Sequence, residues 1–106
     1  MEHSRLIPQW RNTAVSNRYS FATTKKFDKE YAKLNEADKK LVDSVVDMLL
    51  AGTPLPEKYH DHQLKGNLKD FRDCHVKPDL VLIYSKENNV LIITAYRINT
   101  HSELGL

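Results

Sequence analysis

The order of its hydrophobic patterns constrains this chain more than any other feature of the sequence: helical periods come first and strand-like runs follow. Phe27, Tyr31 and Leu34 recur at the spacing of one helix face, and a wider apolar stripe runs from residue 41 to 50. Gly52 and the prolines after it favour an end to the second helix. Because the helices precede the strands instead of alternating with them, the sequence predicts an α+β fold with an antiparallel sheet.

Three strand-like runs make up most of the second half, at residues 69–76, 80–86 and 90–98. Short turns rich in Pro, Asp and Asn separate these runs, so consecutive runs are expected to pair as a meander. A brief alternating stretch that begins at Tyr19 supplies one earlier strand. We therefore expect two N-terminal helices packed on an antiparallel sheet of about four strands, in one domain over residues 19–106.

The remaining N-terminal segment, residues 1–18, shows no sustained period, and we interpret it as an extension of unknown role. A chain of 106 residues favours one domain, and 41% hydrophobic with 28% charged residues is typical of a globular protein. The net charge of +2 permits an anionic partner without requiring one. No stretch has the apolar length of a signal peptide or approaches the roughly 18 residues of a membrane span. We expect a cytoplasmic protein with no membrane partner.

The single cysteine, Cys74, excludes an internal disulfide and a cysteine zinc site, which fits a reducing compartment. On a strand, Cys74 projects opposite to its neighbours Asp73 and His75, so we interpret it as a small core residue.

Asp73 and His75 share one strand face, and a hairpin at Lys77-Pro78 would fold Asp79 back beside His75. Carboxylates near an imidazole fix its tautomer and raise its pKa, and both effects help proton transfer. A solvated strand end with no function is the open alternative at this point.

Four of the five histidines lie in the second half, around the predicted sheet: His60, His62, His75 and His101. Imidazoles and carboxylates also bind zinc or manganese, but the sequence has no HExxH motif and no paired cysteines. We therefore predict no metal site and no cofactor, and expect His60 and His3 to be solvated surface residues.

Basic residues are spread over the loop and sheet region, and those that could bind a substrate are Arg72, Arg97, Lys65 and Lys77. Lysines on strands often serve only solubility and edge protection. Together with histidines, however, they suit a phosphodiester. Cleavage of RNA without a metal needs a base for the 2′-hydroxyl, an acid for the leaving 5′-oxygen and cations around the phosphorane.

Four motifs then occur in a fixed order: DHQLKG at residues 61–66, FRDCHVKPD at 71–79, LIY at 82–84 and THSEL at 100–104. In this order they resemble the YafQ branch of the RelE-superfamily toxins, from about Tyr19 to Leu104. The resemblance implies the toxin of a type II toxin–antitoxin pair, a ribosome-dependent endoribonuclease that cuts mRNA in the A site without a metal. It also implies a cognate antitoxin of the DinJ/RelB type as partner, with operator DNA bound only through that antitoxin.

The active-site residues of that family fall on five positions of this chain: His62, Asp73, His75, Asp79 and His101. We expect His101 to be the general acid and His75 or His62 the base. The two aspartates would orient these imidazoles and stabilise their charge.

Arg97 or Arg72 would face the scissile phosphate, and strand alternation allows only one of Tyr96 and Arg97 to point into the site. Leu80 and Gly105 stand where the family has aromatic residues, which would weaken stacking on bases. Two other functions stay open from the sequence: a member that only binds its antitoxin and acts as a co-repressor, and a metal-dependent hydrolase.

Overall fold

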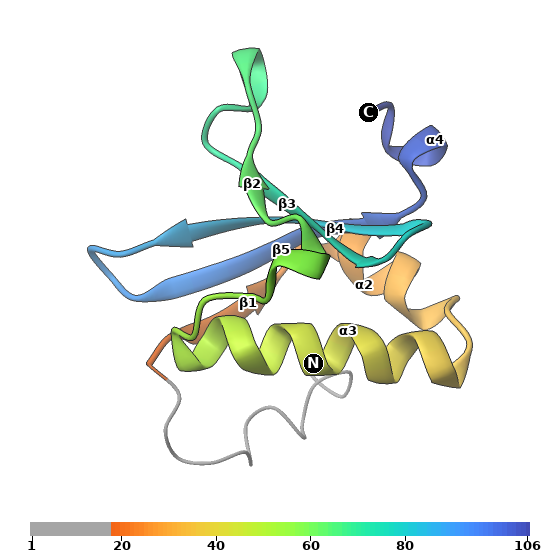
Figure 1. The fold of residues 1–106 in the computed structure, drawn as a ribbon, viewed down its shortest axis with the longest axis horizontal. Helices are drawn as coiled ribbons and strands as arrows, with labels where there is room; N and C mark the ends of the chain where they lie inside the picture. Colours follow the sequence, from red (N-terminus) through yellow and green to blue (C-terminus); the bar gives the residue numbers. More distant parts are fainter. Residues whose placement is uncertain (1–17) are drawn as a thin grey trace.

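The computed structural model describes residues 18–106, so the predicted N-terminal extension lies, apart from Arg18, outside the described residues (Figure 1). The helices and strands, with the two 3₁₀ turns labelled η, follow in chain order: β1 (Ser20–Thr23), α2 (Lys25–Ala32), α3 (Glu36–Ala51), η2 (Glu57–Tyr59), β2 (His62–Gln63), η3 (Gly66–Leu68), β3 (Arg72–Lys77), β4 (Leu80–Glu87), β5 (Ile92–Asn99) and α4 (His101–Leu104).

The strands form one sheet in the order β1-β5-β4-β3-β2, and the predicted α+β class is confirmed. The sheet differs from the expectation in two respects. It has a fifth strand, β2, whose two residues are too few to show any period. In addition, β1 runs parallel to β5, whereas the other neighbouring strands are antiparallel. The helices α2 and α3 follow β1 and separate it in sequence from β3. As a result β1 is an edge strand of the sheet, paired with the last strand, β5.

Both main helices begin at side-chain caps. The Thr24 hydroxyl accepts a hydrogen bond from the Phe27 amide at 3.0 Å, and the Asn35 side-chain oxygen accepts one from the Asp38 amide at 2.7 Å. The longer helix, α3, ends at Gly52, whose φ of +79° lies in the left-handed region that favours glycine.

One face of the sheet is covered by α3, and the core lies between them (Figure 1). Its buried members come from α3 (Val42, Val45, Val46, Leu49, Leu50), from α2 (Phe27, Tyr31), from the residue before β1 (Tyr19) and from the inward positions of β3, β4 and β5 (Cys74, Val76, Leu80, Leu82, Tyr84, Ile93, Ala95, Ile98). The buried Cys74 confirms its assignment to the core. Leu41, at the start of the apolar stripe, is instead 41% exposed.

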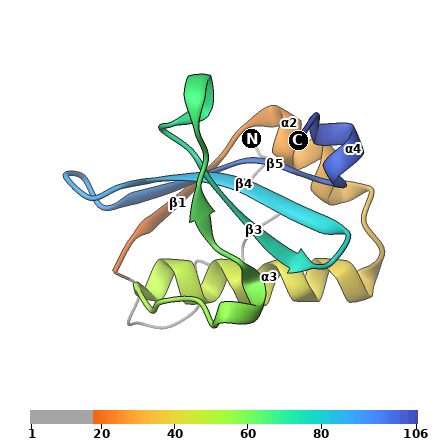
Figure 2. The same ribbon diagram turned by 45° about the horizontal axis from the view of Figure 1, so that its top comes forward.

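The opposite face of the sheet carries the loop with η3 on one side and α4 on the other; both rise away from α3 (Figure 2). We call this the open face. It holds the outward residues of β3 and β4, among them Asp73, His75 and Val81.

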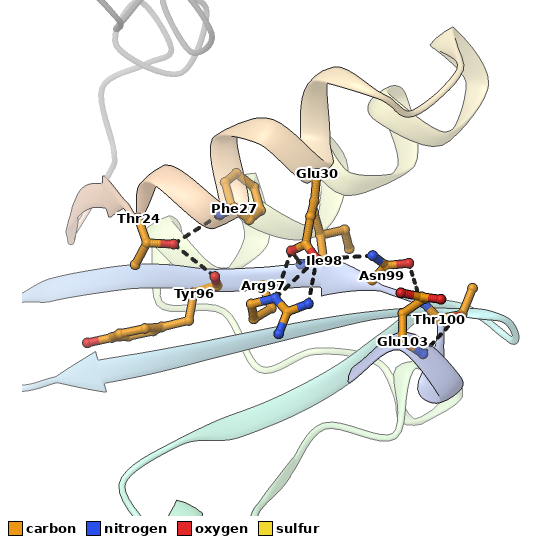
Figure 3. A network of polar contacts seen from close by, with 9 residues as sticks. All are labelled: Thr24, Phe27, Glu30, Tyr96, Arg97, Ile98, Asn99, Thr100 and Glu103. Carbon is orange, nitrogen blue, oxygen red and sulfur yellow. Dashed lines mark hydrogen bonds and ion pairs between the residues drawn. The ribbon is translucent and has the colours of Figure 1, made fainter. Parts of the chain in front are cut away.

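The outer edge of β5 is completed by α2, since β1 pairs with β5 only as far as Ala95. Beyond that point the Thr24 hydroxyl donates to the Tyr96 carbonyl at 2.9 Å, and the Glu30 carboxylate accepts from the Ile98 amide at 3.0 Å (Figure 3). Side chains of α2 therefore take the hydrogen bonds that a neighbouring strand would otherwise make.

Candidate active site

Three imidazoles from three separate elements meet on the open face. The ring of His75, on β3, lies 4.9 Å from the ring of His101 and 5.5 Å from that of His60, measured between centroids, and both contacts are edge-on. His101 is the first residue of α4, which the Thr100 hydroxyl caps by accepting from the Glu103 amide. His60 follows η2. We call these three residues the histidine cluster.

His60, which the sequence predicts to be a solvated surface residue, is a member of this cluster. Its side chain is exposed, yet its ring adjoins His75. The sequence feature that predicts a role for His60 is the spacing His60-Asp61-His62, which places two imidazoles in the short segment that leads to β3.

His62 lies next to the cluster and has a defined tautomer. Its Nδ1 is 2.8 Å from the His60 carbonyl, which can only accept, so in the neutral ring Nδ1 carries the hydrogen and Nε2 remains the basic nitrogen. The same Nδ1 is 3.2 Å from a carboxylate oxygen of Asp73, the residue opposite His62 in the β2–β3 pair.

Asp73 is the buried carboxyl of the site, with 3% of its surface exposed. Its Oδ1 is the oxygen that lies 3.2 Å from His62 Nδ1, and this ion-pair contact is not accompanied by a hydrogen bond of good geometry within residues 18–106. Burial raises the pKa of this carboxyl, and the positive charges that His62, His75 and His101 can carry act in the opposite direction. A buried carboxyl whose pKa is shifted by burial and by neighbouring imidazoles is typical of a functional site.

The pKa of His75 is lowered from its ordinary value of 6.5, first by burial and then by the charge of His101, while Asp73 acts against both. His75 is therefore neutral near pH 7 and able to accept a proton.

Asp79 does not lie where the turn was expected to bring it. The residue opposite His75 is Val81, and Asp79 is exposed in the turn. The predicted register is wrong because Pro78 and Asp79 form the turn itself, between Lys77 and its strand partner Leu80, so Asp79 is not part of the returning strand.

Both candidate arginines are engaged by carboxylates. Arg72 contacts Asp61 through Nε at 3.2 Å and Nη2 at 3.3 Å, and the same carboxylate accepts from the Tyr84 hydroxyl at 2.6 Å. Arg97 contacts Glu30 through Nη2 at 2.7 Å and Nε at 3.0 Å (Figure 3). These charge-assisted pairs fix the two guanidinium groups in place.

The two candidate lysines differ from each other. Lys77 forms an ion pair with Asp38 of α3, with Nζ 2.9 Å from Oδ1. Lys65 is exposed just before η3. The roles of these lysines, of the arginines and of the histidines in a reaction stay predictions.

Tyr96 and Arg97 both line one groove on the open face, although strict strand alternation would put them on opposite faces. The β4–β5 pairing passes from Ile83 opposite Arg97 to Tyr84 opposite Ala95, which leaves Tyr96 as an extra residue. Such a bulge interrupts the alternation of side chains on which the expectation depended.

No group of three or more His, Cys, Asp or Glu side chains within the described part of the chain is arranged to hold a metal ion. None of the helices described is long and apolar enough to cross a bilayer.

Comparison with known proteins shows to which class of proteins this chain belongs. Residues 19–105 match a model of bacterial toxins from type II toxin–antitoxin systems. Within that class the matching family is YafQ, and the chain belongs to the YafQ toxin family. The resemblance seen in the four sequence motifs is thereby confirmed.

Two relatives illustrate the similarity. The mRNA interferase toxin YafQ of Escherichia coli K12 is 36% identical over 78 residues, which are 73% of this chain and 83% of that protein. A YafQ toxin of Haemophilus influenzae is 42% identical over 65 residues, 59% of this chain. The second match spans 64% of the relative, somewhat less than two thirds of its length.

Solved structures share the fold. A copper-bound mutant toxin from Helicobacter pylori has a TM-score of 0.74 and 35% identity, over 81% of this chain and 98% of that one. YafQ in the E. coli DinJ–YafQ toxin–antitoxin complex has a TM-score of 0.73 and 28% identity, over 82% of this chain and 97% of that one.

Proposed function

We propose that this protein is an mRNA interferase, an endoribonuclease that cuts mRNA in the ribosomal A site and is held inactive by a cognate antitoxin. The observation that carries the proposal is the histidine cluster beside the buried Asp73 on the open face. The name of the E. coli relative supports the activity, and the DinJ–YafQ complex supports an antitoxin as the partner.

In the proposed reaction, neutral His75 removes the proton of a 2′-hydroxyl, and the 2′-oxygen attacks the adjacent phosphorus. Protonated His101 gives its proton to the 5′-oxygen as the P–O bond breaks. A centroid separation of 4.9 Å allows both rings to reach one phosphodiester group. We favour His75 over His62 as the base because its ring is the one that contacts the ring of His101.

The negative charge that develops on the phosphate needs cations. Because Arg72 and Arg97 are already paired with Asp61 and Glu30, we assign this role mainly to protonated imidazoles, with His60 and His62 beside the reacting pair.

The proposal is tested by induced expression of the wild type and the His101→Ala variant in a bacterium, with primer extension on a reporter mRNA. The wild type should arrest growth and produce cuts within translated codons, and His101→Ala should produce neither. Ser102→Ala, at the next exposed position of α4, is the matched control and should behave as the wild type. Normal cutting by His101→Ala would contradict the assigned role.

A metal-dependent hydrolase is the first alternative, since one structural relative binds copper. Toxin treated with a chelator and then freed of it should cut mRNA on untreated ribosomes as well as untreated toxin does. Loss of cutting that added metal restores would favour the metal-dependent reaction.

A member that only binds its antitoxin is the second alternative. It is favoured by the pairing of both arginines with carboxylates and by Leu80 at a position where the family has an aromatic residue. It predicts neither arrest nor cuts from folded wild type, together with retained binding to the antitoxin.

A further inference from the structure

A groove of about 440 Å³ lies on the open face, beside the histidine cluster and between the start of α2, the η3 loop and α4. Two aromatic residues line it, Phe71 and Tyr96. The remaining lining residues that matter here are apolar or basic: Leu68, Ile83, Leu104 and the exposed Lys26. None of the functions considered above uses this groove.

The aromatic pair gives the groove a surface suited to a planar ligand. The rings of Phe71 and Tyr96 are 4.6 Å apart between centroids and nearly perpendicular, at 84°. Each ring is only partly buried, so part of its surface faces the groove. Partly exposed aromatic rings on a sheet are the surfaces on which RNA-binding domains stack unpaired bases.

The groove adjoins the histidine cluster along the sheet. Ile83, at the floor of the groove, is opposite Asp73 on one side and Arg97 on the other. Val81, the next residue of β4 on the same face, is opposite His75. Two residues along a strand span about 7 Å, a distance that one nucleotide of an extended strand can bridge.

The charges around the groove favour a base over a phosphate group as the ligand. The guanidinium of Arg97 is already held by Glu30, and the rest of the lining is mainly apolar. Lys26 stands at the rim, where it can contact the phosphate that follows a bound base.

We propose that the groove between Phe71 and Tyr96 binds one unpaired base of the mRNA, next to the phosphate that the histidine cluster cuts. The proposal rests on the proposed function and extends it to substrate recognition. The pair supplies base stacking in a chain that has Leu80 and Gly105 at the aromatic positions of its family. Tyr96 is available for this contact because of the bulge in β5.

The experiment measures single-turnover cutting of mRNA on ribosomes, as a function of toxin concentration, for wild type, Tyr96→Leu and Tyr96→Phe. Leucine keeps an apolar side chain but removes the ring, whereas phenylalanine keeps the ring. Val90→Ala, at an exposed residue between β4 and β5, is the control. A second series uses mRNAs that lack one base at successive positions around the codon.

Tyr96→Leu should raise the toxin concentration for half-maximal cutting about 5-fold to 150-fold, the range expected for one stacked base. Tyr96→Phe should lose less, and Val90→Ala should match the wild type. Removal of the base at one position should cause a similar loss in the wild type and little further loss in Tyr96→Leu.

Two results would overturn the proposal while leaving the proposed function intact. In the first, Tyr96→Leu cuts mRNA at the same toxin concentrations as the wild type. In the second, the loss caused by Tyr96→Leu and the loss caused by removing a base are additive at every position of the mRNA. Weaker binding of the antitoxin by Tyr96→Leu, with cutting unchanged, would assign the groove to the antitoxin instead. Wild type that cuts no mRNA would refute the proposed function itself. Circular dichroism melts of each variant show whether it is folded.

Discussion

Replacement of Glu30 should destabilise the protein more than replacement of any exposed glutamate, because this carboxylate joins α2 to β5. It accepts from the Arg97 guanidinium, from the Ile98 amide at 3.0 Å and from the Asn99 side-chain amide at 3.0 Å (Figure 3). Asn99 in turn accepts from the Thr100 amide at 2.9 Å, directly before His101. The Glu30 contacts therefore also support the start of α4.

The magnitude follows from burial. Only 10% of the Glu30 side chain is exposed, and 29% of that of Arg97. Loss of one partner of a buried ion pair costs about 3–5 kcal/mol. Arg97 can regain part of its hydration, so we expect Glu30→Ala to lose about 2–4 kcal/mol. For a domain of this size that lowers Tm by roughly 10–20 °C. Glu30→Gln, which keeps one oxygen and the shape, should lose about half as much.

The assay is urea and thermal unfolding followed by circular dichroism, with Glu36→Ala as the control. Glu36 is also in an ion pair with a cation, Lys39 at 3.7 Å, but its side chain is 86% exposed. Its replacement should change the free energy of unfolding by less than about 0.5 kcal/mol. If Glu30→Ala and Glu36→Ala unfold alike, the argument from the Glu30 contacts is refuted.

The pH dependence gives a second check on Glu30. Burial alone would raise its pKa, but the hydrogen bonds from Arg97, Asn99 and Ile98 outweigh burial and hold the pKa below the ordinary value of 4.5. The stability due to the charged carboxylate is thus complete above pH 4.5 and lost as the pH falls through the lowered pKa. The difference in stability between wild type and Glu30→Gln should shrink over the same interval.

Three further predictions concern the site and the core. His60→Ala should reduce cutting, because it removes a ring beside His75, but by less than the roughly 10²–10⁴-fold loss expected for a catalytic acid such as His101; an unchanged rate on ribosomes would show that the ring has no part in the reaction. The single-turnover rate should fall as the pH drops through the pKa of His75, below 6.5, because a base acts only when neutral; persistence of that fall in a His75→Gln variant would assign it to another group. Burial raises the pKa of the Cys74 thiol, so the native protein should react with a thiol reagent far more slowly than the protein in urea; equal rates would contradict the buried position.

The parts of the fold that could be predicted are those with a long repeating pattern. The stripe that ends at Leu50 and the alternation around Cys74 each extend over enough residues to fix which side chains face the core. The strand β2 could not be predicted, since two residues show no alternation. Nor could the parallel place of β1, which depends on where the rest of the sheet leaves a free edge.

The site was predictable in its residue types more than in its geometry. Strand alternation correctly put Asp73 and His75 on one face, and the motif order supplied His62 and His101. Two details of the geometry have local causes: Asp79 is part of the two-residue turn, which leaves Val81 opposite His75, and one bulge in β5 brings Tyr96 and Arg97 to the same groove. A single inserted residue reverses every facing that alternation predicts beyond it, and the sequence carries no mark of where the insertion falls.

The backbone of His60 has a consequence for how such a chain can evolve. With φ of 48° and ψ of 44°, it holds a left-handed conformation that suits glycine and strains a residue with a side chain by about 1 kcal/mol. Selection for heat resistance alone would therefore favour glycine here, at the expense of the ring beside His75. Stability and activity therefore favour different residues at position 60. If this position is randomised, variants selected for a high melting temperature should be enriched in glycine, whereas variants selected for toxicity should keep histidine.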